Sequence, residues 1–266
     1  MNRVDKASIG GLLVGLTGVI GGLLLEGGHL SQILQPTAAM IVFGGTAGAV
    51  LLQFPLPVVA SALRSLARVF LDPHEDLEKG IGLLVQFANR ARREGIVKLD
   101  SEVEQITDPF LKKSLTLAVD GTEPQELRSI MELELDNQSE RAEQLHGVFE
   151  SAGGFSPTVG IIGAVLGLIQ VMQHLDKIDE VGRGIAVAFV ATIYGVAAAN
   201  LLFLPAAGKL RIRLREQQIQ SEMMLEGVIS ILEGMNPRML ETKLRSFIVE
   251  SEVKRTPKAR GAGAGA

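Results

Sequence analysis

The stretch that decides the fold is SAGGFSPTVGIIGAVLGLIQVMQHL, residues 151–175, which contains no Asp, Glu, Lys or Arg. A helix rises 1.5 Å per residue, so roughly 20 such residues cross the ~30 Å hydrocarbon core of a membrane. Residues 7–25, 37–63 and 184–208 are equally free of charged side chains. The sequence therefore predicts an all-α polytopic membrane protein with four transmembrane helices.

The charged segment 64–150 separates the second span from the third. We predict that it folds as a helical cytoplasmic domain inserted between these spans. The expected divisions are 1–63 for spans one and two with a short N-terminus, 64–150 for the inserted domain, 151–208 for spans three and four, 209–252 for C-terminal cytoplasmic helices, and 253–266, with its alternating Gly and Ala, for a disordered tail.

The distribution of basic residues predicts the topology. Of 26 Lys and Arg residues, eleven lie in 64–150 and eleven follow residue 208, whereas the connection 26–36 has none. Basic residues accumulate on the cytoplasmic side of a membrane. We therefore expect an inner-membrane protein with both termini in the cytoplasm. Glu26-Gly27-Gly28 is not a small-x-small cleavage site, so the first span is expected to be retained.

Composition argues against several classes of function. The absence of Cys excludes disulfides and thiolate metal sites, and no pair of the four His has metal-ligand spacing. A net charge of −4 argues against a nucleic-acid partner. No nucleophile, base and orienting group occur together, so we expect neither an enzyme nor a cofactor.

Helix start and stop signals divide the soluble segments. Asp72-Pro73 followed by Glu75 predicts a helix start, and Gly95 predicts its end. Side chains at helical spacing predict its apolar face: Leu77, Ile81, Leu84, Ala88 and Ala91.

Further signals follow along the chain. Asp108-Pro109 predicts a second helix that ends near Asp120-Gly121. The capping box Thr122-x-x-Gln125 predicts a third, which runs toward the third span. The helix of the fourth span is expected to continue to Asn236-Pro237, with a short helix at 238–250. No strand is predicted.

Small residues recur four positions apart within the spans. The pairs Gly11 and Gly15, Gly18 and Gly22, Gly44 and Gly48, and Gly163 and Gly167 each form a G-x-x-x-G motif. Such faces let helix backbones approach closely in lipid. Packing within one subunit explains some of them, and four such faces also predict a homo-oligomer.

The spans carry no carboxylate, although an ion-conducting protein normally has one there. Their polar residues are Thr158, Thr192, Tyr194 and Asn200. If the chain lines an ion path, the titrating group belongs to another chain. A lone Thr in a span usually bonds to its own helix, and a Tyr usually serves packing, so both interpretations stay open.

The runs GGFSPTVGIIGAVLGL (153–168) and GRGIAVAFVATIYGV (182–196) resemble the A subunit of the bacterial flagellar motor stator. This is the MotA/PomA family, and the chain is similar to its MotC-like branch. The first run is shared with the TolQ and ExbB energisers, and the four-span layout with a large insert favours the stator. Shorter matches occur at 25–28, 43–46, 91–95, 119–121, 225–227 and 233–237.

The resemblance implies a pentamer of A subunits around a dimer of single-span B subunits of the MotB/PomB type. The B subunit would supply the proton-accepting Asp, and the inserted domain would exert torque on the rotor protein FliG. Pro157 and Pro205 match two prolines that are critical in the family, where we expect a hinge. Ordinary helix kinks are the other interpretation.

Two further inferences follow from the resemblance. Arg92 and Asp100 match the charged pair that engages the rotor, and Arg93 and Glu102 crowd the same corner; charges there are otherwise a solvated face. Sodium-type members have Thr at the position of Ala164 and a Thr pair at 191–192, so the lost hydroxyls predict H+ as the coupling ion.

Two other functions remain as alternatives. A TolQ/ExbB-like energiser of an outer-membrane process would use the same proton chemistry, but those proteins have three spans. A small-molecule transporter would usually show internal repeats and polar sites at the membrane midplane, and the sequence shows neither.

Overall fold

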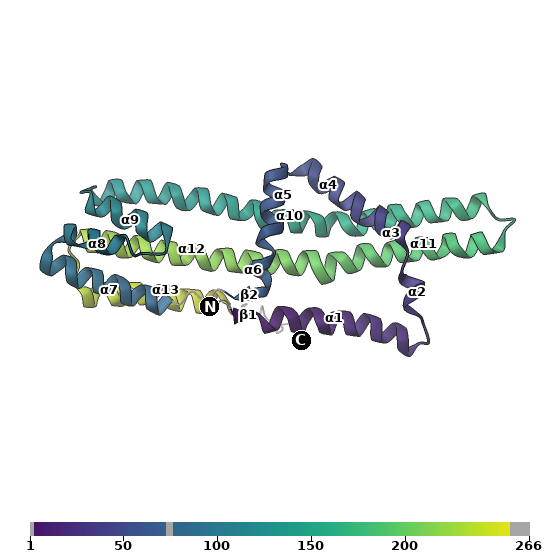
Figure 1. Ribbon diagram of the computed structural model, residues 1–266, viewed down its shortest axis with the longest axis horizontal. Helices are drawn as coiled ribbons and strands as arrows, with labels where there is room; N and C mark the ends of the chain where they lie inside the picture. Colours follow the sequence, from purple (N-terminus) through teal and green to yellow (C-terminus); the bar gives the residue numbers. More distant parts are fainter. Residues whose placement is uncertain (1–2, 73–76, 256–266) are drawn as a thin grey trace, which may run out of the picture. The chain divides into compact units, whose positions relative to one another are not determined.

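The computed structural model describes residues 3–72 and 77–255 and is almost entirely helical (Figure 1). The chain divides into two compact units, 1–74 with 141–213 and 75–140 with 214–266. Among the described residues, four helices are long and apolar enough to cross a membrane. The all-α fold with four spans is thereby confirmed. The limits of the compact units fall after residues 74, 140 and 213, whereas the expected domain limits were 63, 150 and 208.

The first span and the connection after it belong to the first unit. Helix α1 (Lys6–Leu25) coincides with the expected span, and α2 (Leu30–Ile33) follows it. The second span begins as α3 (Pro36–Ala39), continues through a π-helical segment, η1 (Met40–Gly44), and ends as α4 (Gly45–Gln53).

The uncharged run 37–63 contains the second span but is not one continuous helix, because the span ends at Phe54-Pro55. Phe54 is extended, at φ −120° and ψ 142°, as residues before proline usually are. A new helix, α5 (Leu56–Ser65), begins directly after Pro55, and α6 (Ala67–Phe70) follows. Pro57 lies in the first turn of α5, where its missing N–H costs no helical hydrogen bond.

A short strand pair joins the residues before α1 to those after α6. Strand β1 (Arg3–Val4) pairs antiparallel with β2 (Leu71–Asp72), with Arg3 opposite Asp72 and Val4 opposite Leu71. The prediction of no strand was therefore wrong at these four residues. The pairing joins residues far apart in sequence, which no local pattern indicates.

Two long helical runs carry the third and fourth spans. Helix α10 (Pro124–Gln173) contains the third span, and α11 (Ile178–Ala197) begins the fourth after a short turn (Figure 1). The fourth continues through a second π-helical segment, η3 (Ala198–Phe203), into α12 (Leu204–Leu232). The capping box at Thr122 was wrong, since α10 begins at Pro124, with the Leu127 N–H bonded to the Glu123 carbonyl at 2.9 Å.

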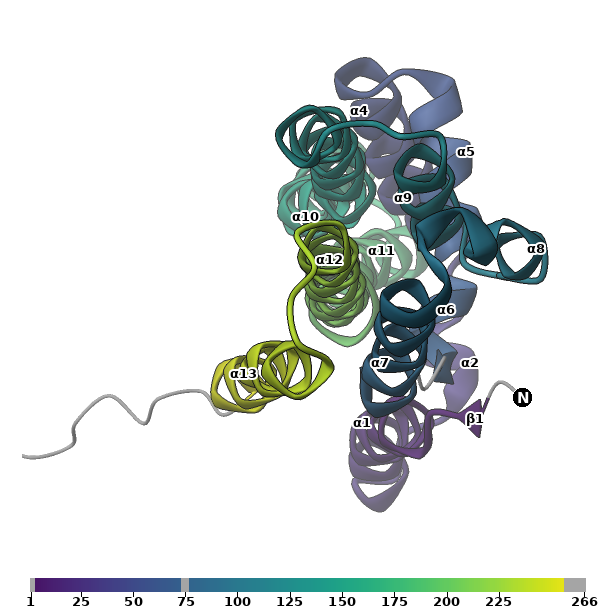
Figure 2. The ribbon, with the colours of Figure 1, turned by 90° about the vertical axis from the view of Figure 1, so that its left-hand side faces the viewer.

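The second unit packs parts of α10 and α12 with shorter helices. These are α7 (Leu77–Glu94), η2 (Ile96–Leu99), α8 (Asp100–Val103), α9 (Pro109–Val119) and α13 (Pro237–Arg255). Figure 2 shows α7, α12 and α13 close to end-on. Large side chains from these elements are fully buried in its core: Leu84, Leu99, Leu111, Leu115, Leu127, Met131, Met223, Ile229, Leu240 and Leu244.

Several helix ends of this unit were predicted from local residues and are confirmed. Gly95 ends α7 with φ +85°, a conformation that favours glycine. Asp108 caps α9 by accepting a hydrogen bond from the Leu111 N–H at 2.8 Å. The expected start at Asp72-Pro73 and Glu75 falls on residues 73–76, which lie outside the described residues. Helix α13 is longer than the predicted 238–250 and includes 253–255 of the expected tail, whose remainder also lies outside the described residues.

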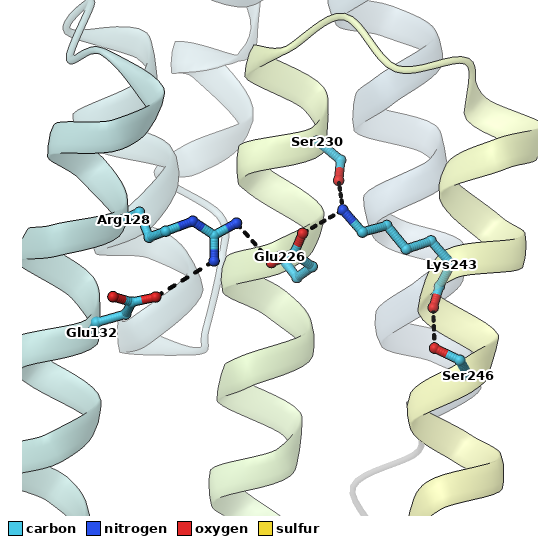
Figure 3. A network of polar contacts seen from close by, with 6 residues as sticks. All are labelled: Arg128, Glu132, Glu226, Ser230, Lys243 and Ser246. Atoms are coloured by element: carbon cyan, nitrogen blue, oxygen red, sulfur yellow. Dashed lines mark hydrogen bonds and ion pairs between the residues drawn. The ribbon is translucent and has the colours of Figure 1, made fainter.

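A charge network connects three helices of the second unit (Figure 3). Glu226 of α12 accepts a hydrogen bond from Arg128 of α10 at 2.9 Å and another from Lys243 of α13. Lys243 also donates to the Ser230 hydroxyl at 3.2 Å. Burial acts to raise the pKa of Glu226, but the hydrogen bonds from Lys243 and Arg128 outweigh it and lower the pKa below its usual value. The carboxylate therefore holds both cations as a charged partner.

Candidate functional site

Spans three and four meet through glycines that bring their backbones into contact. A Cβ on Gly195 would lie 2.5 Å from the carbonyl oxygen of Ser156, and a Cβ on Gly167 would lie 2.8 Å from that of Gly184. Gly160 faces the Ala191 carbonyl in the same way, at 2.9 Å. No larger residue fits at these positions without moving a helix, so the glycines set the close approach of α10 and α11.

The glycine motifs divide into a packed group and an open group. Gly163 and Gly167 contact α11 within this chain, and Gly15 faces the Leu201 side chain. The other members would meet nothing within 4 Å of an added Cβ: Gly11, Gly18, Gly22, Gly44 and Gly48. In a single chain their faces are open to another helix or to lipid.

The two threonines of the expected ion path bond to their own helices. Thr192 donates to the Ala188 carbonyl at 3.3 Å, and Thr158 donates to the Phe155 carbonyl at 2.7 Å. Thr192 is half-buried and Thr158 is exposed on the single chain. The O–H of each threonine is thus used in a hydrogen bond, and its oxygen keeps a lone pair that can accept from water or contact an ion.

Tyr194 holds the start of the second span against α11. Its hydroxyl donates to the Ile33 carbonyl and accepts a hydrogen bond from the Gln35 N–H at 3.3 Å. Its ring lies 6.2 Å from that of Phe43, centroid to centroid. Tyr194 therefore packs two spans together while its hydroxyl stays hydrogen-bonded. This agrees with the interpretation that a Tyr in a span serves packing.

A cavity of about 750 Å3, lined by both polar and apolar side chains, opens where α10 and α11 are joined. His174, in the connection, lies 3.0 Å from the Gln170 carbonyl through Nδ1 and 3.4 Å from Glu180 through Nε2. Polar side chains within or near membrane spans suit a water-filled cavity. The polar lining of the cavity also includes Gln35, Thr37, Gln173 and Arg183. No sequence motif marks these residues as a site.

The two prolines lie at different kinds of place. Pro157 is inside α10, and a Cβ on Gly195 would be 3.2 Å from its Cα, so it borders the glycine contact. Pro205 is exposed in the first turn of α12, directly after η3. In η3 the Leu204 N–H bonds to the Ala199 carbonyl five residues back. The fourth-span helix thus departs from regular α bonding across 198–205, because a π turn is followed by a residue without an N–H.

Asn200 lies within this irregular segment. Its side-chain amide donates to the Val196 carbonyl at 2.9 Å and supplements the backbone bonds there. From the sequence, Asn200 was predicted only as a polar residue of the span. The π segment itself has no sequence signal apart from the nearby proline.

The expected rotor-binding residues lie at one corner of the second unit. Arg92 and Arg93 are exposed in the last turn of α7, and Asp100 is the exposed first residue of α8. Glu102 differs from them because it is half-buried and pairs with Arg90. Arg90 also lies 3.5 Å from Glu94, and this spacing of four residues on a helix is a local signal that could have predicted the pair.

Arg92 also borders a cavity of about 260 Å3. The cavity lies between the end of α7 and the turn after α12, and its other lining is mainly apolar: Ala88, Ala91, Ile96, Ile231, Leu232, Gly234 and Met235. No group of three His, Asp or Glu placed to hold a metal ion occurs in residues 3–72 and 77–255.

Comparison with known proteins matches both halves of the chain to families. Residues 9–95 match the motility protein A N-terminal family, and residues 102–223 match the MotA/TolQ/ExbB proton channel family. Motility protein A of Bacillus subtilis is 35% identical over 247 residues, which cover 92% of this chain and 91% of that protein. The chemotaxis protein PomA of Vibrio alginolyticus is 30% identical, with 94% of this chain and 97% of that protein covered.

Solved structures give the same result. The structure of C. jejuni MotAB has a TM-score of 0.86 at 31% identity, covering 91% of this chain and 95% of that chain. The flagellar MotAB stator complex from Bacillus subtilis has a TM-score of 0.83 at 34% identity, covering 95% and 100%. The chain therefore belongs to the motility protein A family of flagellar stator subunits, within the MotA/TolQ/ExbB proton channel family.

Proposed function

We propose that this chain works with a B subunit of the MotB/PomB type as a proton channel whose ion flux drives torque for motility. The observation that carries the proposal is the match, over nearly the whole chain, to the A component of MotAB complexes. The chain is a channel and torque subunit and not an enzyme.

The B subunit supplies the titrating group. Proton transfer through a membrane needs an ionisable side chain within it, and 151–175 and 184–208 contain no Asp or Glu. The glycine contact between α10 and α11 instead builds a narrow two-helix wall, on which Thr158 and Thr192 offer hydroxyl lone pairs. We propose that this wall faces the B subunit's Asp.

The coupling ion is H+. Sodium needs several oxygen ligands, whereas a proton needs only a carboxylate and a path of water and hydroxyls. Ala164 and Ala191 provide no hydroxyl where sodium-type members have one, and Ala191 is fully buried against span three. The cavity beside His174 and Glu180 has room for water next to the spans, which either ion could use. The proposal needs no other cofactor.

The force passes through the proline region of the spans to the rotor. Pro157 borders the glycine contact and Pro205 follows a π segment, so both lie where the helices lack regular backbone bonds. Arg92, Arg93 and Asp100 are exposed at one corner of the second unit and provide the charged surface for FliG, with Glu102 held in place by Arg90.

The assembly is a homo-oligomer, a pentamer around a dimer of B subunits by family resemblance. The open glycines of α1 and of the second span (Gly44 in η1 and Gly48 in α4) support it, because they can accept helices of other subunits. The basic residues of 64–150 and of the segment after 208 support an inner-membrane protein with both termini in the cytoplasm.

Reconstitution tests the proposal directly. Liposomes that carry the chain together with its B subunit should take up protons, and liposomes with this chain alone should not. Motility restored to a strain without other stators should require both subunits. Proton uptake by the chain alone, or restoration of an outer-membrane energising function in place of motility, would contradict it.

A further inference from the structure

The first span is attached to the rest of its unit at few places. Helix α1 has no buried residue along its 20 positions. A cavity of about 410 Å3 lies between its first turns and the fourth-span helix, bordered by Gly11, Leu12, Leu201 and Pro205 among others. The side chains of α1 therefore do little to fix the span against this chain.

Asp5, directly before α1, is the exception. It is only 9% exposed, and its carboxylate accepts hydrogen bonds from the Ala7 N–H at 3.0 Å and from the Ser8 hydroxyl at 3.1 Å. The same carboxylate pairs with Lys209 and lies 3.4 Å from Arg213. One side chain thus caps α1 and binds two cations of α12.

Lys209 and Arg213 are four residues apart on α12, so they lie on one face of the helix. Both follow Pro205 by one to two turns, which places their ion pairs with Asp5 immediately beyond the irregular segment 198–205. Where backbone bonds are fewer, side-chain contacts have more influence on the direction of the helix that follows. The ion pairs of Asp5 are therefore placed where they can influence the direction of α12.

The carboxylate is ionised under all conditions inside a cell. The hydrogen bond from Lys209, opposed by burial and aided by the Ser8 hydroxyl, lowers the pKa of Asp5 to about 2. A buried charge persists only with such partners. The chain before it is held as well, because Arg3 and Val4 pair with Leu71 and Asp72.

We infer that Asp5 is a positioning residue of the stator, an anchor that joins the first span to the part of α12 directly after Pro205. When α12 moves at the proline region, the anchor makes the first span move with it or resist it. This inference rests on the proposed function, since it assigns Asp5 a role in passing force from the spans to the rotor. A plain helix cap is the simpler alternative.

The substitution Asp5→Asn separates the two roles. Asn caps helices about as well as Asp, but it cannot form the ion pairs with Lys209 and Arg213. The variant is produced with its B subunit in a strain without other stators, and tethered motors are followed as single stators join. Each stator that joins the motor adds a step to its rotation speed, and this step should fall by roughly two-fold or more. The amount of the chain found in the membrane should stay unchanged.

Two further variants complete the test. Asp5→Glu keeps the charge and should restore most of the step, and Lys6→Gln changes the exposed neighbour and should leave the step at the wild-type value. A wild-type step with Asp5→Asn would overturn the inference. A lower membrane content with an unchanged step per stator would also overturn it, since Asp5 would then serve stability alone.

A distance measurement tests the inference without relying on motility, for the case that motors with Asp5→Asn do not turn. The chain has no Cys, so spin labels on Lys6→Cys and Ile212→Cys would be the only two on each copy of the chain, and mixing with an excess of unlabelled chain separates their distance from distances between copies. The distance distribution between them, in the purified complex, should broaden when Asp5→Asn is added. An unchanged distribution would overturn the anchor. If the wild-type chain and its B subunit together gave no motility, the proposed function would be contradicted. The measured distance distributions would still decide whether Asp5 is an anchor.

Discussion

A Cβ on Gly195 of the fourth span would lie 2.5 Å from the carbonyl oxygen of Ser156 in the third. The same Cβ would be 3.2 Å from the Cα of Pro157, so the helix backbones touch beside the proline of the third span. Thr192 lies one turn away on α11. The contact therefore lies where the hinge and the ion path are proposed to meet.

Gly195→Ala should disrupt this contact. The neighbouring atom belongs to the backbone and cannot move aside alone, so the added methyl must push α11 away from α10, at a cost of about 1–3 kcal/mol. We expect loss of motility and a lower Tm of the purified complex. Gly182→Ala on the same helix, where a Cβ meets nothing within 4 Å, is the control and should behave as wild type. Normal swimming by Gly195→Ala would mean that α10 and α11 do not need to be this close.

Glu226→Gln should destabilise the second unit. The change removes the charge that pairs with Arg128 and Lys243 and leaves two half-buried cations near each other (Figure 3). Since these groups are partly solvated, we expect a loss of about 1–3 kcal/mol. Thermal unfolding of the purified protein measures it. Glu241→Gln, which breaks an exposed pair with Arg245, is the control and should cost only ~0–1 kcal/mol. Equal effects of the two changes would show that the network adds no stability.

Much of the fold could be predicted because its signals are local. Uncharged runs located the spans, and Gly95 and Asp108 ended and began helices as expected. Phe54 shows how such a signal can be outweighed: Pro55 was visible, but the apolar run around it favoured one continuous helix. The pairing of Val4 with Leu71 had no local signal at all.

The site was predicted less completely. The sequence pointed to Thr192 and allowed that it bonds to its own helix, which the structure shows. It did not single out Asp5, whose partner Lys209 is about two hundred positions away, because only the folded chain brings them together. Arg90 was visible beside Glu94, but its pairing with Glu102 depends on the turn at Gly95. Contacts between distant segments are what a single sequence does not contain.

Stability should not change through titration of Asp5 at cellular pH. Its pKa is lowered to about 2 from an ordinary value near 3.8, so its contribution is complete above the ordinary value and is lost only as pH falls toward 2. The Tm of the wild-type protein and that of Asp5→Asn should therefore differ by the same amount at pH 6 and at pH 8. The difference should shrink below about pH 4. A difference that changes between pH 6 and pH 8 would mean that the carboxylate is not held by Lys209 as the structure has it.

Swimming driven by this stator should not need sodium. Ala164 and Ala191 carry no hydroxyl to help coordinate Na+, so motility should persist in sodium-free medium and stop when a protonophore is added. The strain must contain no other stator, and cell respiration is monitored as the control for general damage. Motility that rises with sodium concentration at constant pH would contradict the assignment of H+.

The rotor contact must form and break within the energy of one ion. A proton that crosses ~150 mV releases about 3.5 kcal/mol, at ~2.3 kcal/mol per 100 mV. Exposed charge pairs, worth ~0–1 kcal/mol each, suit such a contact, and Arg92 and Asp100 are both exposed. A large buried apolar contact would be released too slowly.

Arg92→Glu should therefore cripple torque while membrane assembly and proton conduction stay close to wild type. Reversing the charge at Arg92 replaces attraction by repulsion at an exposed corner, which no core contact of α7 depends on. Arg92→Lys keeps the charge and should retain most of the torque, and a compensating charge reversal on FliG should restore part of what Arg92→Glu loses. Torque is measured on tethered cells that lack any other stator. If Arg92→Glu and Asp100→Lys each swim normally, this corner is a solvated face and the force passes to the rotor elsewhere.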